Sequence, residues 1–168
     1  MRSFKYIRAM LILFVLGLNI GCDQVSKSII RNNLNYYDHI SFINDHFALT
    51  KIENTGAFLS LGDSFPGPVK FIVLKLLPLL AICFGLWYIL NKASLNKTTL
   101  FGIVLIIGGG IGNIYDRIVH GSVTDFMHIK FGLFQTGIFN IADVSIMAGM
   151  FIVLIHAYFK KPLLSQNY

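Results

Sequence analysis

The stretch VTDFMHIKFGLFQTGIFNIADVSIMAG, residues 123–149, places two carboxylates, Asp125 and Asp143, eighteen positions apart. The second carboxylate opens a long apolar run, so it stands at the edge of a membrane segment. A charge in such a place is costly to desolvate and is seldom present without a purpose. The two acids are therefore the first candidates for chemistry in this chain.

The composition around this stretch is that of a membrane protein. The chain has 168 residues, of which 55% are hydrophobic and 13% are charged, and its mean hydropathy is +0.66. In a soluble globular domain about a quarter of the residues are charged, so a lipid environment explains this composition better than water does. The length is that of one domain, and we expect residues 1–168 to form a single compact unit.

Four apolar segments predict the membrane spans, since a spanning helix needs about 20 residues. They predict an all-α polytopic membrane protein with four transmembrane helices at about 7–26, 69–90, 98–115 and 138–159. Residues 32–67 are long enough for a small extramembrane subdomain, and the alternation in residues 47–53 predicts a strand there. The run Gly108-Gly109-Gly110 is weak as helix, and it either lets helices pack closely or leaves room for a ligand backbone.

Basic residues predict the orientation of the chain. The N-terminus, the loop at 91–99 and the C-terminal tail carry seven of the 14 Lys and Arg residues and none of the eight Asp and Glu residues. By the positive-inside rule, both termini are cytoplasmic, and the segments 23–70 and 116–137 lie on the outer side. The net charge of +6 is then a signal of topology. We expect no nucleic-acid partner, because the basic residues are not gathered on one soluble face.

Polar residues cluster at the outer ends of the first and third spans. Asp23 and Lys27 are four apart and share a helix face, as do Asn113, Asp116 and Arg117. Each set is typical of an ion pair at a helix end, and each also fits a role at a functional site. An Arg beside an Asn at membrane depth favours binding of backbone or carbonyl groups, because a guanidinium holds acceptors in a fixed geometry. We also expect Arg117 to pair with Asp116.

Asn140 and Asp143 have the spacing of a helix start, with Asn as the cap and the acid favoured by the helix dipole. Taken alone, Asp143 is more typical of a helix-start charge than of a catalyst, and Asp125 is an ordinary loop residue. The chain between them can nevertheless fold back and bring both acids to the outer surface of the bilayer. Two carboxylates in a partly dry site share one proton, so one can act as a base toward water and the other as an acid toward a carbonyl. That is the arrangement of an aspartic protease.

Two other hypotheses stay open on this evidence. His120, Asp125 and His128 could form the metal site of a membrane hydrolase, although the sequence has no HExxH motif. Alternatively, the chain is a non-catalytic small transporter or assembly factor that uses an intramembrane charge, for which Lys75 is the candidate. We expect Lys70 and Lys75 to reach the outer surface by snorkelling, which disfavours a transport site at mid-bilayer.

Five patches of the sequence resemble the lipoprotein signal peptidases, the signal peptidase II family, in the order of that family. They are Asp23-Gln24 with Lys27, Asn54-Thr55-Gly56-Ala57-Phe58, Gly112-Asn113 with Asp116-Arg117, Val123 with Asp125-Phe126, and Phe139-Asn140 with Ala142-Asp143. Each patch is weak alone, but five in order at the outer ends of four spans are a specific match.

The resemblance implies an intramembrane aspartic endopeptidase that removes the signal peptide from prolipoproteins by cleaving before the diacylglyceryl-modified cysteine. It implies that Asp125 and Asp143 are the catalytic pair. Substrate binding is implied for Asn54, Gly56, Asn113, Arg117 and Asn140, and a supporting role for Asp23, Lys27 and Asp116. The resemblance also implies a small β-rich platform on the outer side, contact with membrane lipid, inhibition by cyclic peptides of the globomycin type, and a place in the bacterial cytoplasmic membrane. No metal or cofactor is expected, because water is the nucleophile.

Overall fold

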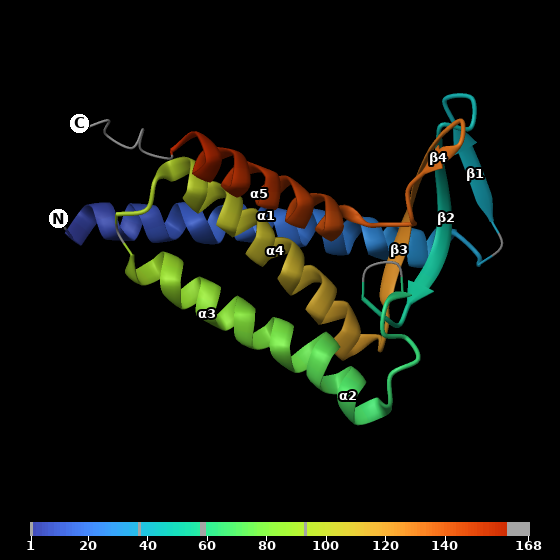
Figure 1. Ribbon diagram of the computed structural model, residues 1–168, viewed down its shortest axis with the longest axis horizontal. Helices are drawn as coiled ribbons and strands as arrows, with labels where there is room; N and C mark the ends of the chain where they lie inside the picture. The colour runs from blue at the N-terminus through green and yellow to red at the C-terminus, as the bar shows by residue number, and fades with distance from the viewer. Residues whose placement is uncertain (1, 37, 58–59, 93, 161–168) are drawn as a thin grey trace, which may run out of the picture.

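The computed structural model describes residues 2–160 apart from 37, 58–59 and 93, so Phe58 of the second patch lies outside the described residues. The chain forms a group of long helices with a small sheet at one end (Figure 1). In chain order the elements are α1 (Arg2–Asn33), β1 (His39–Phe42), β2 (Phe47–Asn54), α2 (Gly67–Phe71), the π-helix η2 (Ile72–Leu76), α3 (Leu77–Asn91), α4 (Lys97–Val119), β3 (Val123–Phe131), β4 (Phe134–Gln135) and α5 (Ile141–Phe159).

Four helical segments are long and apolar enough to cross a membrane. They are Tyr6–Asn33, Gly67–Asn91 (which joins α2, η2 and α3), Lys97–Val119 and Ile141–Phe159. With the small sheet they confirm the predicted class, a four-helix membrane protein with a β-rich platform. Helix α1 continues past residue 26, the predicted end of the first span, because its polar residues Lys27 and Arg31 turn toward the protein and are buried or half-buried. The assignment of residues 1–168 to a single domain stays a prediction.

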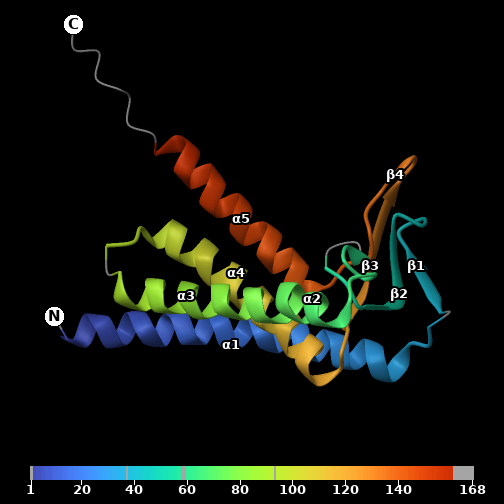
Figure 2. The ribbon, with the colours of Figure 1, turned by 60° about the horizontal axis from the view of Figure 1, so that its bottom comes forward.

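Helix α4 contacts the other three spans and packs most closely on α5 (Figures 1 and 2). A Cβ atom at Gly109 would overlap the carbonyl oxygen of Ala142 in α5, and one at Gly149 of α5 would overlap the carbonyl oxygen of Gly102. Small residues thus let the two backbones touch, as they often do between membrane helices. The Gly108-Gly109-Gly110 run lies inside a continuous helix, so close packing is the alternative that the structure shows.

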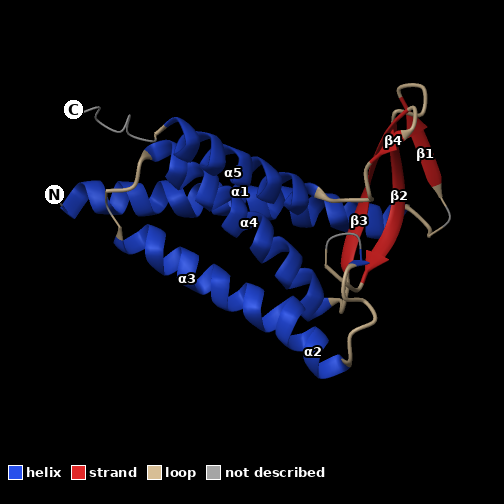
Figure 3. Cartoon of the chain, viewed as in Figure 1, coloured by secondary structure: helices blue, strands red, loops and turns tan. Residues whose placement is uncertain are grey.

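The platform is a four-stranded antiparallel sheet in the order β1-β2-β3-β4, and it lies at one end of the helices (Figure 3). The strand predicted at residues 47–53 is confirmed by β2. Residues 123–135 supply β3 and β4, so the sheet draws on two separate parts of the chain. The sheet is fixed to the helices by an apolar cluster in which Ile30 of α1 and Leu34, just after α1, pack with Phe126 of β3.

Asp125 lies in β3, so the expectation that it belongs to a loop was wrong. Its neighbour across the sheet is Ile52 of β2, next to a register shift between Leu49 and Ile52. Irregularities of this kind re-aim side chains and are frequent beside active sites. The strand places Asp125 over the end of the helices, where the first turn of α5 begins.

Candidate active site

Asp125 and Asp143 line one cavity between the sheet and the helices. Asp125 comes from β3 and Asp143 from the first turn of α5, and the cavity has a volume of about 310 Å³. Three of the residues implied in substrate binding line the same cavity, namely Asn54, Asn113 and Arg117. Its apolar side is formed by Ile138, Ile146 and Met147. The fold therefore brings together two acids that lie in different elements.

Asp125 is held by two asparagine amides in a position that is only 3% exposed. Asn54 Nδ2 donates to Asp125 Oδ2 (2.9 Å), and Asn140 Nδ2 donates to Asp125 Oδ1 (2.6 Å). Burial raises the pKa of Asp125 to about 6 against the hydrogen bond from Asn54, and the charge of Asp143 adds to the rise. This carboxyl therefore keeps its proton at a mildly acidic pH at which an exposed aspartate has lost it.

Asp143 is fixed by the start of α5. Asn140 is the N-cap: its Oδ1 accepts from Asp143 N (3.0 Å), and Asp143 Oδ2 accepts from Asn140 N (3.2 Å). These reciprocal bonds confirm the predicted cap and form a capping box. Asn113 Nδ2 also donates to Asp143 Oδ1 (2.9 Å). Because Asn140 bonds to Asp125 as well, one residue sets the position of one acid relative to the other.

Arg117 holds the turn that follows β2 against α4. It donates to the carbonyl oxygens of Gly56 (2.8 Å) and Asn113 (3.4 Å). The backbone is tight at Gly56, where a Cβ atom would stand 2.5 Å from the carbonyl carbon of Ser60. The expected pair of Arg117 with Asp116 was wrong, because consecutive helix residues point about 100° apart and Asp116 faces α1 instead. Arg117 thus binds two backbone carbonyls of the protein itself, and its contact with a substrate stays a prediction.

The buried ammonium group of Lys27 joins two further carboxylates, those of Asp23 and Asp116, close to the site of Asp125 and Asp143. Lys27 Nζ is 2.8 Å from Asp23 Oδ2 and 2.9 Å from Asp116 Oδ2, and all three side chains are fully buried. It also donates to Asn113 Oδ1 (2.9 Å), and the amide nitrogen of Asn113 in turn donates to Asp143. One ammonium group thus links Asp23 and Asp116 to Asn113, the residue that donates to Asp143.

Asp23 also fixes the start of α5. Its Oδ1 accepts from the backbone nitrogen of Ala142 (2.9 Å), the residue before Asp143. A helix start has backbone N–H groups without helical acceptors, and a carboxylate is a strong partner for them. At Gly112 a Cβ atom would come within 2.5 Å of Asp23 Oδ2, so glycine is needed there for α1 and α4 to approach.

Arg31 belongs to the same network, and sequence reasoning missed it. Its Nη2 is 2.9 Å from Asp116 Oδ1, and its Nε donates to Thr124 Oγ1 (2.7 Å), next to Asp125 in β3. The spacing Asp23, Lys27, Arg31 repeats every four residues and so marks one helix face. This spacing is the sequence pattern that places Arg31 on the same helix face as Asp23 and Lys27.

The geometry does not support the metal hypothesis. Within the parts of the chain that the structure describes, no three His, Cys, Asp or Glu side chains are grouped to hold a metal ion. His120 Nε2 lies 3.1 Å from Arg31 Nη1, and a guanidinium at that distance opposes a metal cation on the same ring nitrogen. Both carboxylate oxygens of Asp125 accept hydrogen bonds from asparagine amides, so they are already engaged within the protein.

The fold and the site define a multi-pass membrane protein with two carboxylates at one cavity, at the sheet end of its helices. The profile of the family described as signal peptidase (SPase) II matches residues 15–159. The chain belongs to that family.

Individual relatives agree with this assignment. The lipoprotein signal peptidase of Clostridioides difficile (strain 630) is 38% identical over 150 residues, which cover 89% of this chain and 96% of the relative. That of Borrelia duttonii (strain Ly) is 31% identical over 155 residues, covering 89% and 90%. Two solved structures described as bacterial membrane enzymes are each 23% identical and share the fold, with TM-scores of 0.81 and 0.77. They cover 94% and 90% of this chain, and 93% and 94% of their own.

Proposed function

We propose that the chain is an aspartic endopeptidase that removes the signal peptide from lipid-modified prolipoproteins, cleaving before the diacylglyceryl-modified cysteine. The observation that carries this proposal is the cavity that Asp125 and Asp143 share. Membership of the signal peptidase II family supports it, and the relatives' name, lipoprotein signal peptidase, indicates the substrate class. The two acids then have distinct duties, which follow from their surroundings.

Asp143 is the base and Asp125 the acid in this proposal. Asp143 lies in the first turn of α5, where the helix dipole favours a negative charge, so it accepts a proton from the attacking water. Asp125, with its raised pKa, carries the shared proton and gives it to the oxygen of the scissile carbonyl. The water oxygen bonds to the carbonyl carbon, and the proton taken by Asp143 passes to the nitrogen as the C–N bond breaks. One hydroxyl of the intermediate returns its proton to Asp125, so the pair ends with the one proton it began with. No cofactor enters these steps.

The asparagines position the acids in this scheme. Asn54 and Asn140 donate to Asp125, and Asn113 donates to Asp143, so their amides are engaged with the acids in this structure. In this scheme the residues that contact the substrate are Arg117 and the apolar residues of the cavity wall. The apolar residues Ile146 and Met147 belong to a span, which allows the apolar part of the signal peptide to lie among the helices while its acyl chains stay in the bilayer.

A direct assay tests the proposal. The purified chain is incubated with a diacylglyceryl-modified prolipoprotein, and release of the signal peptide is followed by mass spectrometry. The same prolipoprotein without the lipid is the matched control, and we expect it to remain intact. A lack of cleavage of the modified substrate across a range of detergents and lipids would contradict the proposal.

The orientation completes the proposal: both termini cytoplasmic, and the two acids near the outer face of the bacterial cytoplasmic membrane. The charge distribution along the chain supports this orientation. A reporter fused after Tyr168, a residue outside the described part of the chain, should therefore behave as cytosolic. Labelling of that fusion by an impermeant reagent from outside intact cells would contradict the orientation.

Arg117→Lys should lower turnover by roughly 10- to 100-fold, since hydrogen bonds from a charged group contribute about 1.5–3 kcal/mol. Lysine keeps the charge but not the fork that joins the Gly56 carbonyl to α4. The turn that carries Asn54, and with it the hydrogen bond to Asp125, then loosens. Cleavage rates of the variant and the wild type measure the effect.

Arg8 offers a matched control for that variant. It also donates to two backbone carbonyls, those of Ile89 (3.0 Å) and Lys92 (2.9 Å), but at the opposite end of the helices. Arg8→Lys should leave turnover close to that of the wild type. Equal rates for the two variants would mean that Arg117 has no special role in the site.

The rate of cleavage should depend on pH as a bell-shaped curve. Above a pH of about 6 the shared proton is lost, because that is the pKa to which burial raises Asp125, and two carboxylates then face one cavity. At low pH both acids are protonated and no base is left. The two limbs belong to the pair as a whole. A rate that stays flat from pH 4 to pH 9, with the protein folded throughout, would contradict a shared proton.

A further inference from the structure

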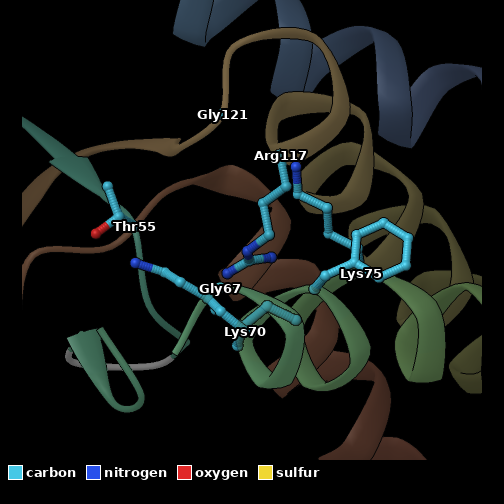
Figure 4. Close-up of a pocket in the computed structure, with 8 residues that line it drawn as sticks. Thr55, Gly67, Lys70, Lys75, Arg117 and Gly121 are labelled. Atoms are coloured by element: carbon cyan, nitrogen blue, oxygen red, sulfur yellow. The ribbon is translucent and has the colours of Figure 1, made fainter. Parts of the chain in front are cut away.

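A second cavity, of about 280 Å³, lies at the sheet end of the second span and is lined by three cationic side chains (Figure 4). They are Lys70 of α2, Lys75 of η2 and Arg117 of α4. In Figure 4 Lys70 reaches toward Thr55, while Lys75 and Arg117 extend between η2 and α4. The described residues that line this cavity include no acid. The side chains that line the cavity therefore carry positive charge.

The π-helix brings the two lysines to one cavity. Residues five apart in an α-helix point about 140° away from each other, so Lys70 and Lys75 would face different directions in a regular helix. Residues 72–76 instead form a π-helix, in which positions five apart come closer to one face. The wider turn has a local cause: Pro78 has no N–H for the carbonyl of Leu74, and its ring crowds that group.

The positive charge in the cavity is only partly balanced within the protein. Lys70 pairs with Asp63 at 2.8 Å, and Asp63 is half exposed at the rim. Lys75 is half-buried in the second span and forms no ion pair with any residue that the structure describes. Arg117 Nε is buried and has no hydrogen-bond acceptor among the described residues. Cations at membrane depth are costly unless they meet a partner, so the cavity is suited to an anion.

We propose that this cavity binds a phosphate group, supplied by the headgroup of an anionic phospholipid. Three cations around one space match a phosphate, and basic pockets between spans are typical lipid-headgroup sites. Phe71 and Leu74 give the cavity an apolar wall, and Leu77, at the start of α3, is exposed on the surface of the second span. A glycerophospholipid can then place its phosphate among the cations and its acyl chains along α3. Because Arg117 lines both cavities, the bound headgroup would lie next to the site of Asp125 and Asp143.

The test measures lipid binding by the full chain in detergent, with no cleavage in the readout, so it stands whether or not the proposed peptidase activity does. Phosphatidylglycerol and phosphatidylcholine are titrated separately and bound lipid is counted by native mass spectrometry. Lys70→Gln with Lys75→Gln should weaken phosphatidylglycerol binding about 25-fold, from about fivefold for each lysine, and leave phosphatidylcholine binding unchanged.

The control removes the same charge elsewhere. Lys97→Gln with Lys130→Gln changes two exposed lysines outside both cavities, and binding should stay within about twofold of the wild type. Equal phosphatidylglycerol binding by the two double variants would overturn the proposal. If inorganic phosphate binds the wild type as tightly as phosphatidylglycerol does, the lipid source is overturned. If the variant with both Lys70→Gln and Lys75→Gln does not fold, Lys75→Gln alone should weaken phosphatidylglycerol binding about fivefold. An unchanged affinity of that single variant for phosphatidylglycerol would overturn the proposed site.

Discussion

Asp125→Asn and Asp143→Asn are each expected to abolish signal-peptide release, with the rate reduced by at least about 10²–10⁴-fold, the range typical of a lost acid or base. An amide can neither carry the shared proton nor accept one from water. The cavity shared by the two side chains would keep its shape, because Asn and Asp are nearly equal in size. Initial rates with a lipid-modified prolipoprotein measure the loss.

Folding must be measured beside these rates. Each oxygen of Asp125 accepts a hydrogen bond from a different asparagine amide. An Asn side chain at this position would point its own NH₂ group at one of those donors, which lowers stability by about 1–3 kcal/mol. Asn at position 143 loses a helix-dipole interaction of only about 0.3–1 kcal/mol. Asp45→Asn, on the exposed tip between β1 and β2, is the matched control and should cleave normally. Substantial cleavage by either folded active-site variant would rule out the aspartic mechanism.

Lys27→Met should destabilise the fold by about 3–5 kcal/mol, the usual cost of removing one partner from a buried ion pair. Methionine fills a similar volume, so the loss reflects charge rather than space. Without the ammonium, the fully buried Asp23 loses its cation and Asp116 keeps only Arg31. Asn113 also loses a donor, and the support of Asp143 weakens with it. Thermal unfolding of the purified protein in detergent measures the effect.

Lys70→Met is the matched comparison for this second prediction. Lys70 also pairs with an aspartate at 2.8 Å, but its partner Asp63 is half exposed, and pairs of that kind contribute little. We therefore expect a large fall in the unfolding temperature for Lys27→Met and almost none for Lys70→Met. Similar unfolding temperatures for the two would show that the buried network does not hold the helices together.

The four spans and the start of α5 could be predicted from sequence because each rests on a local pattern: hydropathy for the spans, and a capping motif at Asn140 and Asp143 for the helix start. Strand β3 could not be predicted in this way. Its residues Val123 to Phe126 are all buried, since β3 lies against α1 and α4, so the alternation that reveals a strand is absent. The sequence therefore predicts a loop at Asp125, where the structure has a strand.

Partners far apart in the chain were also beyond the reach of the sequence. The bond from Ala142 to Asp23 joins residues 119 positions apart, and no local spacing announces it. The same holds for Asp116: its position beside Arg117 predicted a pair, whereas the packing of α4 on α1 turns it toward Lys27 and Arg31. Side-chain direction in a helix bundle depends on which helices meet, and a single sequence does not state this.

The i, i+4 pair of Asp23 and Lys27 has a consequence for how the chain enters the bilayer during synthesis. When α1 emerges from the ribosome, the residues that later contact this pair, Asn113, Asp116 and Ala142, have not yet been made. The two side chains are on adjacent turns, so each can neutralise the other at once. A neutralised pair enters lipid at a lower cost than a lone charge does. The first helix thus carries its own counterion through insertion, and the later helices find a charge pair already in place when they arrive.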